Sequence, residues 1–230
     1  MAENGELMEL KGKIINFLGD SITEGVGVTD PENRYDNRLQ KLLELAEVHN
    51  CGIGGTRIAH QEKPSDPPVF DLCFCGRAYR LNPAADVIVV YGGVNDYMHG
   101  DAHFGEMSDK TPATFCGAVE YLMNTLKELY PHAKTVFMTP AHVCHNGNSD
   151  ASPFPGEMKK PDAKPLAAYV KVIEEKAHAH DLPVLNLYEK LPIDPNRPED
   201  SERYTVDGLH FNDEGHGVLA NLLADFLRGM

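Results

Sequence analysis

Short apolar runs alternate along this chain with longer segments whose apolar residues recur every three to four positions. Apolar runs bounded by turn-forming residues predict buried strands, and the longer periodic segments predict amphipathic helices. The predicted strands cover residues 14–18, 48–51, 86–91, 134–139 and 183–187, and the predicted helices cover residues 32–46, 69–80, 115–129, 166–177 and 212–227. We expect the last helix to turn Val218, Leu222 and Phe226 inward. This alternation predicts a three-layer α/β/α sandwich with right-handed crossovers.

The length and composition suit a single domain covering residues 1–230. A chain of 230 residues can bury on the order of 70% of its unfolded surface, and 42% hydrophobic residues is ordinary for a globular protein. The sequence contains no repeat and no linker. One long segment without periodicity, residues 142–163, is expected to border a functional cleft, because long loops in compact domains are usually functional.

The charge balance excludes some classes of partner. The formal net charge is −14, from 21 basic and 35 acidic residues, which argues against nucleic acid and anionic lipid. The chain has no apolar run long enough to cross a bilayer and no signal peptide at its start, so we expect no integral membrane segment and a cytoplasmic location. An export signal trimmed from the chain stays an open alternative. The five cysteines are scattered and do not form a disulfide framework.

A serine stands where the first predicted strand ends. Ser21 follows Gly19 and Asp20 directly after residues 14–18. Ligands gather at the carboxyl ends of parallel strands in α/β folds, so Ser21 is placed to be a nucleophile. The same turn can also be only a strand-to-helix connection, with glycine for the turn and Asp20 or Ser21 as the helix N-cap. Taken alone, the serine favours this plainer interpretation.

Other strand-end loops supply the remaining groups that a serine nucleophile needs. A histidine must accept the serine proton and a carboxylate must orient that histidine, and Asp207 and His210 stand three residues apart before the last helix. The oxyanion of the intermediate needs hydrogen-bond donors, which Gly55 and Asn95 can provide after the second and third strands. Together these residues favour a serine hydrolase.

Four sequence blocks in register resemble the GDSL or SGNH hydrolase family. They are Gly19-Asp20-Ser21-Ile22, Asn50-Cys51-Gly52-Ile53-Gly54-Gly55, Gly93-Val94-Asn95-Asp96 and Asp207-Gly208-Leu209-His210, spread over residues 14–216. Two departures are Ile22 in place of the leucine of the family name and Gly54 where serine is often found. Neither departure removes a reacting group.

The resemblance implies a role for each matching residue. Ser21 would be the nucleophile, His210 the base and then the acid, and Asp207 the residue that orients His210. The main-chain N–H groups of Ser21 and Gly55 and the side chain of Asn95 would form the oxyanion hole, while Asp20 would only hold the nucleophile turn. The resemblance also implies a flavodoxin-like, five-stranded parallel sheet (the SGNH hydrolase fold) in the order 2-1-3-4-5, with no metal and no organic cofactor.

The polar character of the expected cleft loops favours small, acetyl-like esters on polar carriers such as acetylated carbohydrate. Lysophospholipase and thioesterase activities of the same family remain alternatives, and the oligomeric state stays open. A non-enzymatic, flavodoxin-like ligand-binding protein is the alternative of a different class, but it would have no need of Asp207 and His210. A metal enzyme could draw on residues 99–103 and 142–145, although neither matches a known metallohydrolase pattern and surface histidines are expected there.

Overall fold

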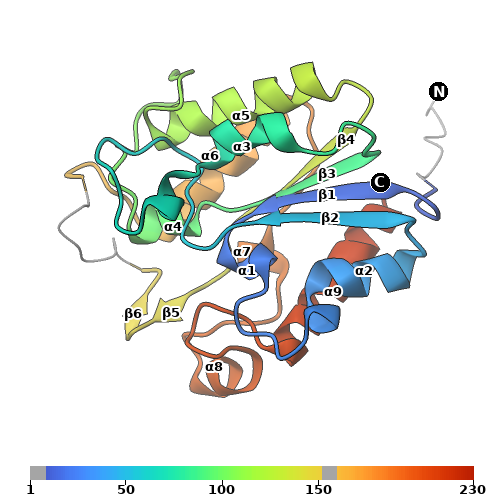
Figure 1. The fold of residues 1–230 in the computed structure, drawn as a ribbon. Helices are drawn as coiled ribbons and strands as arrows, with labels where there is room; N and C mark the ends of the chain where they lie inside the picture. The colour runs from blue at the N-terminus through green and yellow to red at the C-terminus, as the bar shows by residue number, and fades with distance from the viewer. Residues whose placement is uncertain (1–8, 152–159) are drawn as a thin grey trace, which may run out of the picture.

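A computed structural model of the chain describes residues 9–151 and 160–230, and its centre is a parallel five-stranded sheet (Figure 1). The strand order is β2-β1-β3-β4-β7. The bounds are β1 (Ile14–Gly19), β2 (Glu47–Gly52), β3 (Val87–Tyr91), β4 (Lys134–Met138) and β7 (Val184–Leu185). Because β7 is the fifth strand of this sheet, both the predicted fold and the predicted strand order are confirmed.

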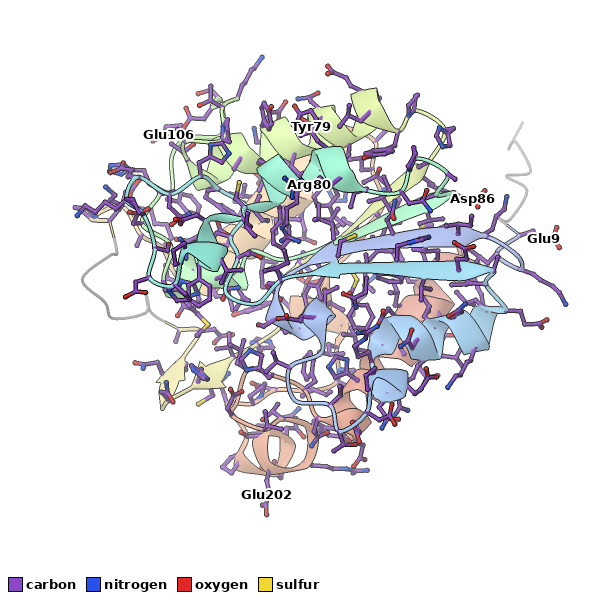
Figure 2. All side chains as sticks on the ribbon, in the orientation of Figure 1. Glu9, Tyr79, Arg80, Asp86, Glu106 and Glu202 are labelled. Atoms are coloured by element: carbon purple, nitrogen blue, oxygen red, sulfur yellow. The ribbon has the colours of Figure 1, made fainter. Side chains whose placement is uncertain are left out.

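Helices cover both faces of the sheet. They are α1 (Ser21–Glu24), α2 (Tyr35–Leu43), α3 (Phe74–Arg77), α4 (Val94–Met98), α5 (Phe115–Leu129), α6 (Leu166–Ala179), α7 (Leu187–Lys190), α8 (Pro198–Tyr204) and α9 (Asp213–Arg228). Helices α3, α5 and α6 lie on one face, and α2 and α9 lie on the other (Figure 1). Side chains fill the spaces between these layers (Figure 2). Within the described ranges, the helices are all too short or too polar to cross a bilayer.

The register of the central strands brings the predicted functional loops to one edge. Gly19 at the end of β1 lies beside Gly52 of β2 on one side and Tyr91 of β3 on the other. The chain therefore leaves these three neighbouring strands at the same level. Strand β3 is buried along its whole length, as its continuous apolar run predicts for a strand covered on both faces.

Two predicted helices are shorter than the periodic pattern indicates. The segment 32–46 contains a 3₁₀ helix at Pro31–Asn33 and then α2, which ends where Glu44 adopts a positive φ of 53°. The segment 69–80 contains 3₁₀ helices at Pro68–Asp71 and Ala78–Arg80 on either side of α3. Apolar spacing does not predict these interruptions, because it does not distinguish the exposed apolar residues Val69, Leu72 and Tyr79 from the buried Phe74 of α3.

The inward face of α9 differs from the predicted one. Leu219, Leu223 and Leu227 are buried, whereas Val218, Leu222 and Phe226 are only partly buried at the border of the core. The prediction of the inward residues was therefore wrong by one position. The reason is that α9 packs against α2 and α8, so its apolar stripe is wide and its centre cannot be located from spacing alone.

His216 of α9 is buried against α2. Its Nδ1 accepts a hydrogen bond from the Tyr35 main-chain N–H over 3.2 Å, and its ring stacks on the Tyr35 ring at 5.9 Å. Burial, with a smaller contribution from the Arg38 cation, lowers the pKa of His216 from 6.5 to about 4. The imidazole is therefore neutral in the folded protein.

This buried histidine should make the fold less stable in acid. Between pH 6.5 and about 4 the unfolded chain binds a proton that the folded chain does not, so stability falls with falling pH, by about 3 kcal/mol in total. Urea unfolding of wild type and His216→Asn at pH 7 and pH 4.5 checks this, because asparagine keeps an acceptor and does not titrate. The variant should lose less stability on acidification. Equal losses would contradict the prediction.

The buried carboxyl group of Asp20 has the opposite effect on the pH dependence of stability over the same acidic pH range. Burial raises the pKa of Asp20 to about 7, so its contribution to stability grows as the pH falls. Both proteins contain Asp20, so the difference between wild type and His216→Asn isolates the effect of His216.

Candidate active site

The structure brings together Ser21, His210 and Asp207. Ser21 begins α1 directly after β1, and the other two residues lie on the turn before α9. Asp207 Oδ2 accepts a hydrogen bond from His210 Nδ1 over 2.7 Å, which leaves Nε2 as the acceptor for the Ser21 hydroxyl at 2.9 Å. The serine proton therefore has a base in hydrogen-bond reach, and that base has an orienting carboxylate.

The turn itself keeps Asp207 ionised. Its Oδ1 accepts the main-chain N–H groups of Leu209 over 3.0 Å and His210 over 2.8 Å. Partial burial acts to raise the pKa of Asp207, but the hydrogen bonds from His210 and Leu209 outweigh it and hold the pKa below the ordinary value of 3.8. The carboxylate is therefore charged at neutral pH, as an orienting group for a histidine must be.

A short hairpin lies against this turn. Strands β5 (Cys144–His145) and β6 (Asn148–Ser149) form it within the predicted loop 142–163, of which residues 152–159 lie outside the described residues. The Cys144 N–H donates to the Gly208 carbonyl over 2.9 Å, and His145 Nδ1 donates to the Asp207 carbonyl over 3.2 Å. This part of the loop therefore borders the site, as expected from its length and lack of periodicity.

Asp20 caps the helix that Ser21 begins. Its Oδ1 accepts the Ile22 N–H over 3.0 Å, and its carbonyl accepts the Glu24 N–H over 2.9 Å. Gly19 is required before it, because a Cβ there would lie 1.9 Å from Thr23 Oγ1. Asp20 thus fixes the turn that carries Ser21.

The loop after β2, residues 53–56, is called the glycine loop here, and it presents the main-chain N–H group of Gly55. Gly55 has a φ of 71°, and a Cβ there would lie 2.1 Å from the Phe70 ring, so other residues are excluded. Within residues 9–151 and 160–230, the N–H groups of Ser21 and Gly55 meet no hydrogen-bond acceptor. The neighbouring Gly54 N–H is instead taken by Glu24 Oε2 over 2.8 Å. These two free donors are what an oxyanion hole requires.

The side chain of Asn95 joins this loop from α4. Its Nδ2 donates to the Thr56 carbonyl over 3.0 Å, and its Oδ1 lies 3.1 Å from His99 Nε2. The adjacent Asp96 carboxylate accepts the N–H groups of Ile58 over 2.8 Å and Ala59 over 3.0 Å. Asn95 and Asp96 therefore tie the segment after the glycine loop to the end of β3.

Arg77 of α3 is a part of the site that the sequence did not indicate. Its Nη2 donates to the Gly19 carbonyl over 2.9 Å and to Thr56 Oγ1 over 2.8 Å, and its Nη1 donates to the Cys51 carbonyl. Burial lowers the pKa of Arg77 to about 10, so it stays charged at neutral pH. One buried cation thus joins the ends of β1 and β2 to the glycine loop.

The histidines considered as metal ligands have other contacts. His99 is half-buried next to Asn95, His103 Nδ1 lies 2.9 Å from Asp162, and His142 Nδ1 lies 2.5 Å from Asp150. The expectation of surface histidines is therefore confirmed for His103, which is exposed, and wrong for the half-buried His99, His142 and His145. Over the part of the chain that the structure describes, no group of three or more potential metal ligands occurs.

A cavity of about 450 Å³ lies beside the glycine loop. Its lining includes Gly52, Ile53, Leu72 and Arg80, but none of Ser21, Asp207 and His210. This cavity is separate from the Ser21 hydroxyl and is no evidence for the size of an acyl pocket.

The fold and the site together define a class: a three-layer α/β protein with the side-chain geometry of a serine hydrolase. Residues 17–218 match the model of the GDSL-like lipase/acylhydrolase family, and the chain belongs to that family. The resemblance inferred from the four sequence blocks is thereby confirmed.

Solved structures share this fold. One is 32% identical with a TM-score of 0.83, covering 97% of this chain and 99% of the other. A protein from Lactobacillus plantarum is 28% identical with a TM-score of 0.79, and the match covers 95% of this chain and 98% of the other. A possible lipase from Chitinophaga pinensis shares the fold: it is 21% identical with a TM-score of 0.64, and the match covers 94% of this chain and 98% of the other. No curated protein matches the chain in sequence.

Proposed function

We propose that this protein is a serine ester hydrolase that cleaves small, acetyl-like esters through an acyl-enzyme. The observation that carries the proposal is the continuous hydrogen-bond chain from the Ser21 hydroxyl through His210 to Asp207. His210 takes the serine proton as Oγ attacks the ester carbonyl and then returns it to the leaving alcohol. A water activated by the same histidine hydrolyses the acyl-enzyme.

The oxyanion of each tetrahedral intermediate would be held by the Ser21 and Gly55 N–H groups and the Asn95 side chain. The two main-chain donors are free within the described residues, and Asn95 Nδ2 has one hydrogen left after its bond to Thr56. These donors are already in position before negative charge develops on the substrate oxygen, because Arg77 fixes the loop that carries them.

Two features support a small acyl group on a polar carrier. The Phe70 ring stands against Gly55 and His99, with ring centroids 5.6 Å apart for Phe70 and His99, so a bulky aromatic side chain lies beside the proposed hole. A polar group at the site is His145, whose Nδ1 donates to the Asp207 carbonyl over 3.2 Å.

Two proteins of known structure with the same fold are esterases of acetylated polysaccharides. A two-domain esterase active on acetylated mannans is 20% identical with a TM-score of 0.61, and an acetyl xylan esterase is 22% identical with a TM-score of 0.60. At this identity the likeness shows the fold alone. Acetylated carbohydrate is nevertheless a substrate class that this fold accommodates.

Hydrolysis of p-nitrophenyl acetate, butyrate and decanoate with EDTA present throughout tests the proposal. We expect kcat/KM to be highest for the acetate and to be unaffected by the chelator, because the proposed substrate carries a small acyl group and the proposed nucleophile is a serine. A preference for decanoate would favour the lysophospholipase alternative. Turnover that EDTA removes would contradict the serine mechanism.

A further inference from the structure

A chain of hydrogen bonds runs from the surface to the amide of Asn95. It starts at Asp71 and Ser65, passes through Arg57 and His99, and ends at Asn95 Oδ1. We infer that His99 and Arg57 are positioning residues that fix the orientation of the Asn95 amide in the oxyanion hole. This inference rests on the proposed function and adds to it the source of the amide's orientation.

The guanidinium of Arg57 sets the tautomer of His99. Arg57 is 1% exposed, and its Nη2 donates to Ser65 Oγ over 2.5 Å and to Asp71 Oδ1 over 3.5 Å. Its Nη1 lies 3.2 Å from His99 Nδ1. A guanidinium can only donate, so Nδ1 must be an acceptor and the proton of the neutral ring is on Nε2.

The tautomer of His99 in turn sets the direction of the Asn95 amide. With its proton on Nε2, His99 donates to Asn95 Oδ1 over 3.1 Å, and Nδ2 then faces the Thr56 carbonyl at 3.0 Å. A flipped amide would place two donors against each other at His99 and two acceptors against each other at Thr56. Only one orientation is satisfied, and it points the second Nδ2 hydrogen away from both partners, available to a substrate oxygen.

Packing holds the His99 ring in place. The Phe70 ring lies on it with an interplanar angle of 40°, and the same Phe70 ring closes against Gly55. The two side chains therefore link the main-chain donor and the side-chain donor of the proposed hole. Displacement of His99 would leave Thr56 as the one orienting partner described here, so the flipped amide, whose oxygen would repel the oxyanion, would be less strongly disfavoured.

A double-mutant cycle between His99 and Asn95 tests the inference. Asn95→Ala should lower kcat for p-nitrophenyl acetate by roughly 10²-fold to 10³-fold with little change in KM. His99→Ala should lower kcat by roughly tenfold, again with KM nearly unchanged, because one orienting hydrogen bond is lost. In the Asn95→Ala background, His99→Ala should have no further effect, since no amide is left to orient.

Two further variants sharpen the result. His99→Gln should retain most of the activity, because its amide can accept from Arg57 and donate to Asn95 as the imidazole does. His178→Ala, an exposed histidine on α6, is the matched control and should leave kcat unchanged. An equal loss from His99→Ala with and without Asn95 would overturn the inference, because His99 would then act on the fold generally.

A readout without turnover separates this inference from the proposed function. Long-range ¹H–¹⁵N spectra of the ¹⁵N-histidine-labelled protein report which ring nitrogen carries the proton. His99 should be the Nε2–H tautomer in wild type and in Ser21→Ala alike. An Nδ1–H tautomer would overturn the positioning role even in an active esterase. An inactive wild type with the Nε2–H tautomer would overturn the proposed function and leave the orientation of the amide established.

Discussion

Ser21→Ala should lower kcat for p-nitrophenyl acetate by roughly 10⁶-fold, the loss seen when a serine nucleophile is removed from a triad. Without Oγ no acyl-enzyme forms, and His210 has no hydroxyl to deprotonate. Residual turnover of roughly 10³-fold to 10⁴-fold above water should persist, because the proposed donors of the oxyanion hole are untouched. KM should change little.

The measurement is single-turnover and steady-state hydrolysis, with circular dichroism to show that the variant is folded. Ser108→Ala, at an exposed serine in the loop before α5, is the matched control and should match wild type. A fluorophosphonate should label wild type on the peptide containing Ser21 and should not label the variant. Labelling at another residue, or a loss of less than about tenfold, would remove Ser21 as the nucleophile.

Asp207→Asn should lower kcat by roughly 10⁴-fold, the loss known for the same exchange in a serine protease triad. The new amide would donate to His210 Nδ1, which moves the ring proton to Nε2, and that nitrogen could no longer accept the proton of Ser21 Oγ. The turn should survive, because asparagine keeps an Oδ1 for the main-chain N–H groups of Leu209 and His210. The substitution therefore changes a tautomer and leaves the geometry in place.

The pH–rate profile of this variant distinguishes lost chemistry from lost structure. The activity of Asp207→Asn should stay far below that of wild type at every pH, because the exchanged tautomer is present at every pH. Asp225→Asn, at the exposed end of α9, serves as the matched control. Activity within tenfold of wild type would show that another carboxylate orients His210.

Local patterns were enough to predict the layers of the fold. Each strand and each main helix buries an apolar run or stripe that is complete within a few turns of chain, so the elements can be found by spacing alone. Their limits were less accurate, as in α9 and the interrupted segment 69–80, because neighbouring helices determine how wide a buried face is.

The candidate site also has a part that the sequence predicts and a part that only the tertiary structure reveals. Ser21, Gly55, Asn95 and the Asp207–His210 pair are contained in short motifs, whose residue types at strand ends point to the chemistry they can perform. The turn before α9 is self-contained, because Asp207 binds residues two and three positions away. Such local hydrogen bonding is dictated by the order of residues and is readable from it.

The tertiary structure alone decided which buried side chains support these motifs. Arg77 contacts a carbonyl 58 positions away, and Arg57 contacts a histidine 42 positions away. Neither arginine is in a motif, and His99 resembled a surface residue. By itself, the sequence determined the order of elements, the proposed reacting groups and the turns that hold them. Long-range burial determined the tautomer of His99 and the amide direction of Asn95, because a hydrogen-bond partner is chosen only when distant segments pack together.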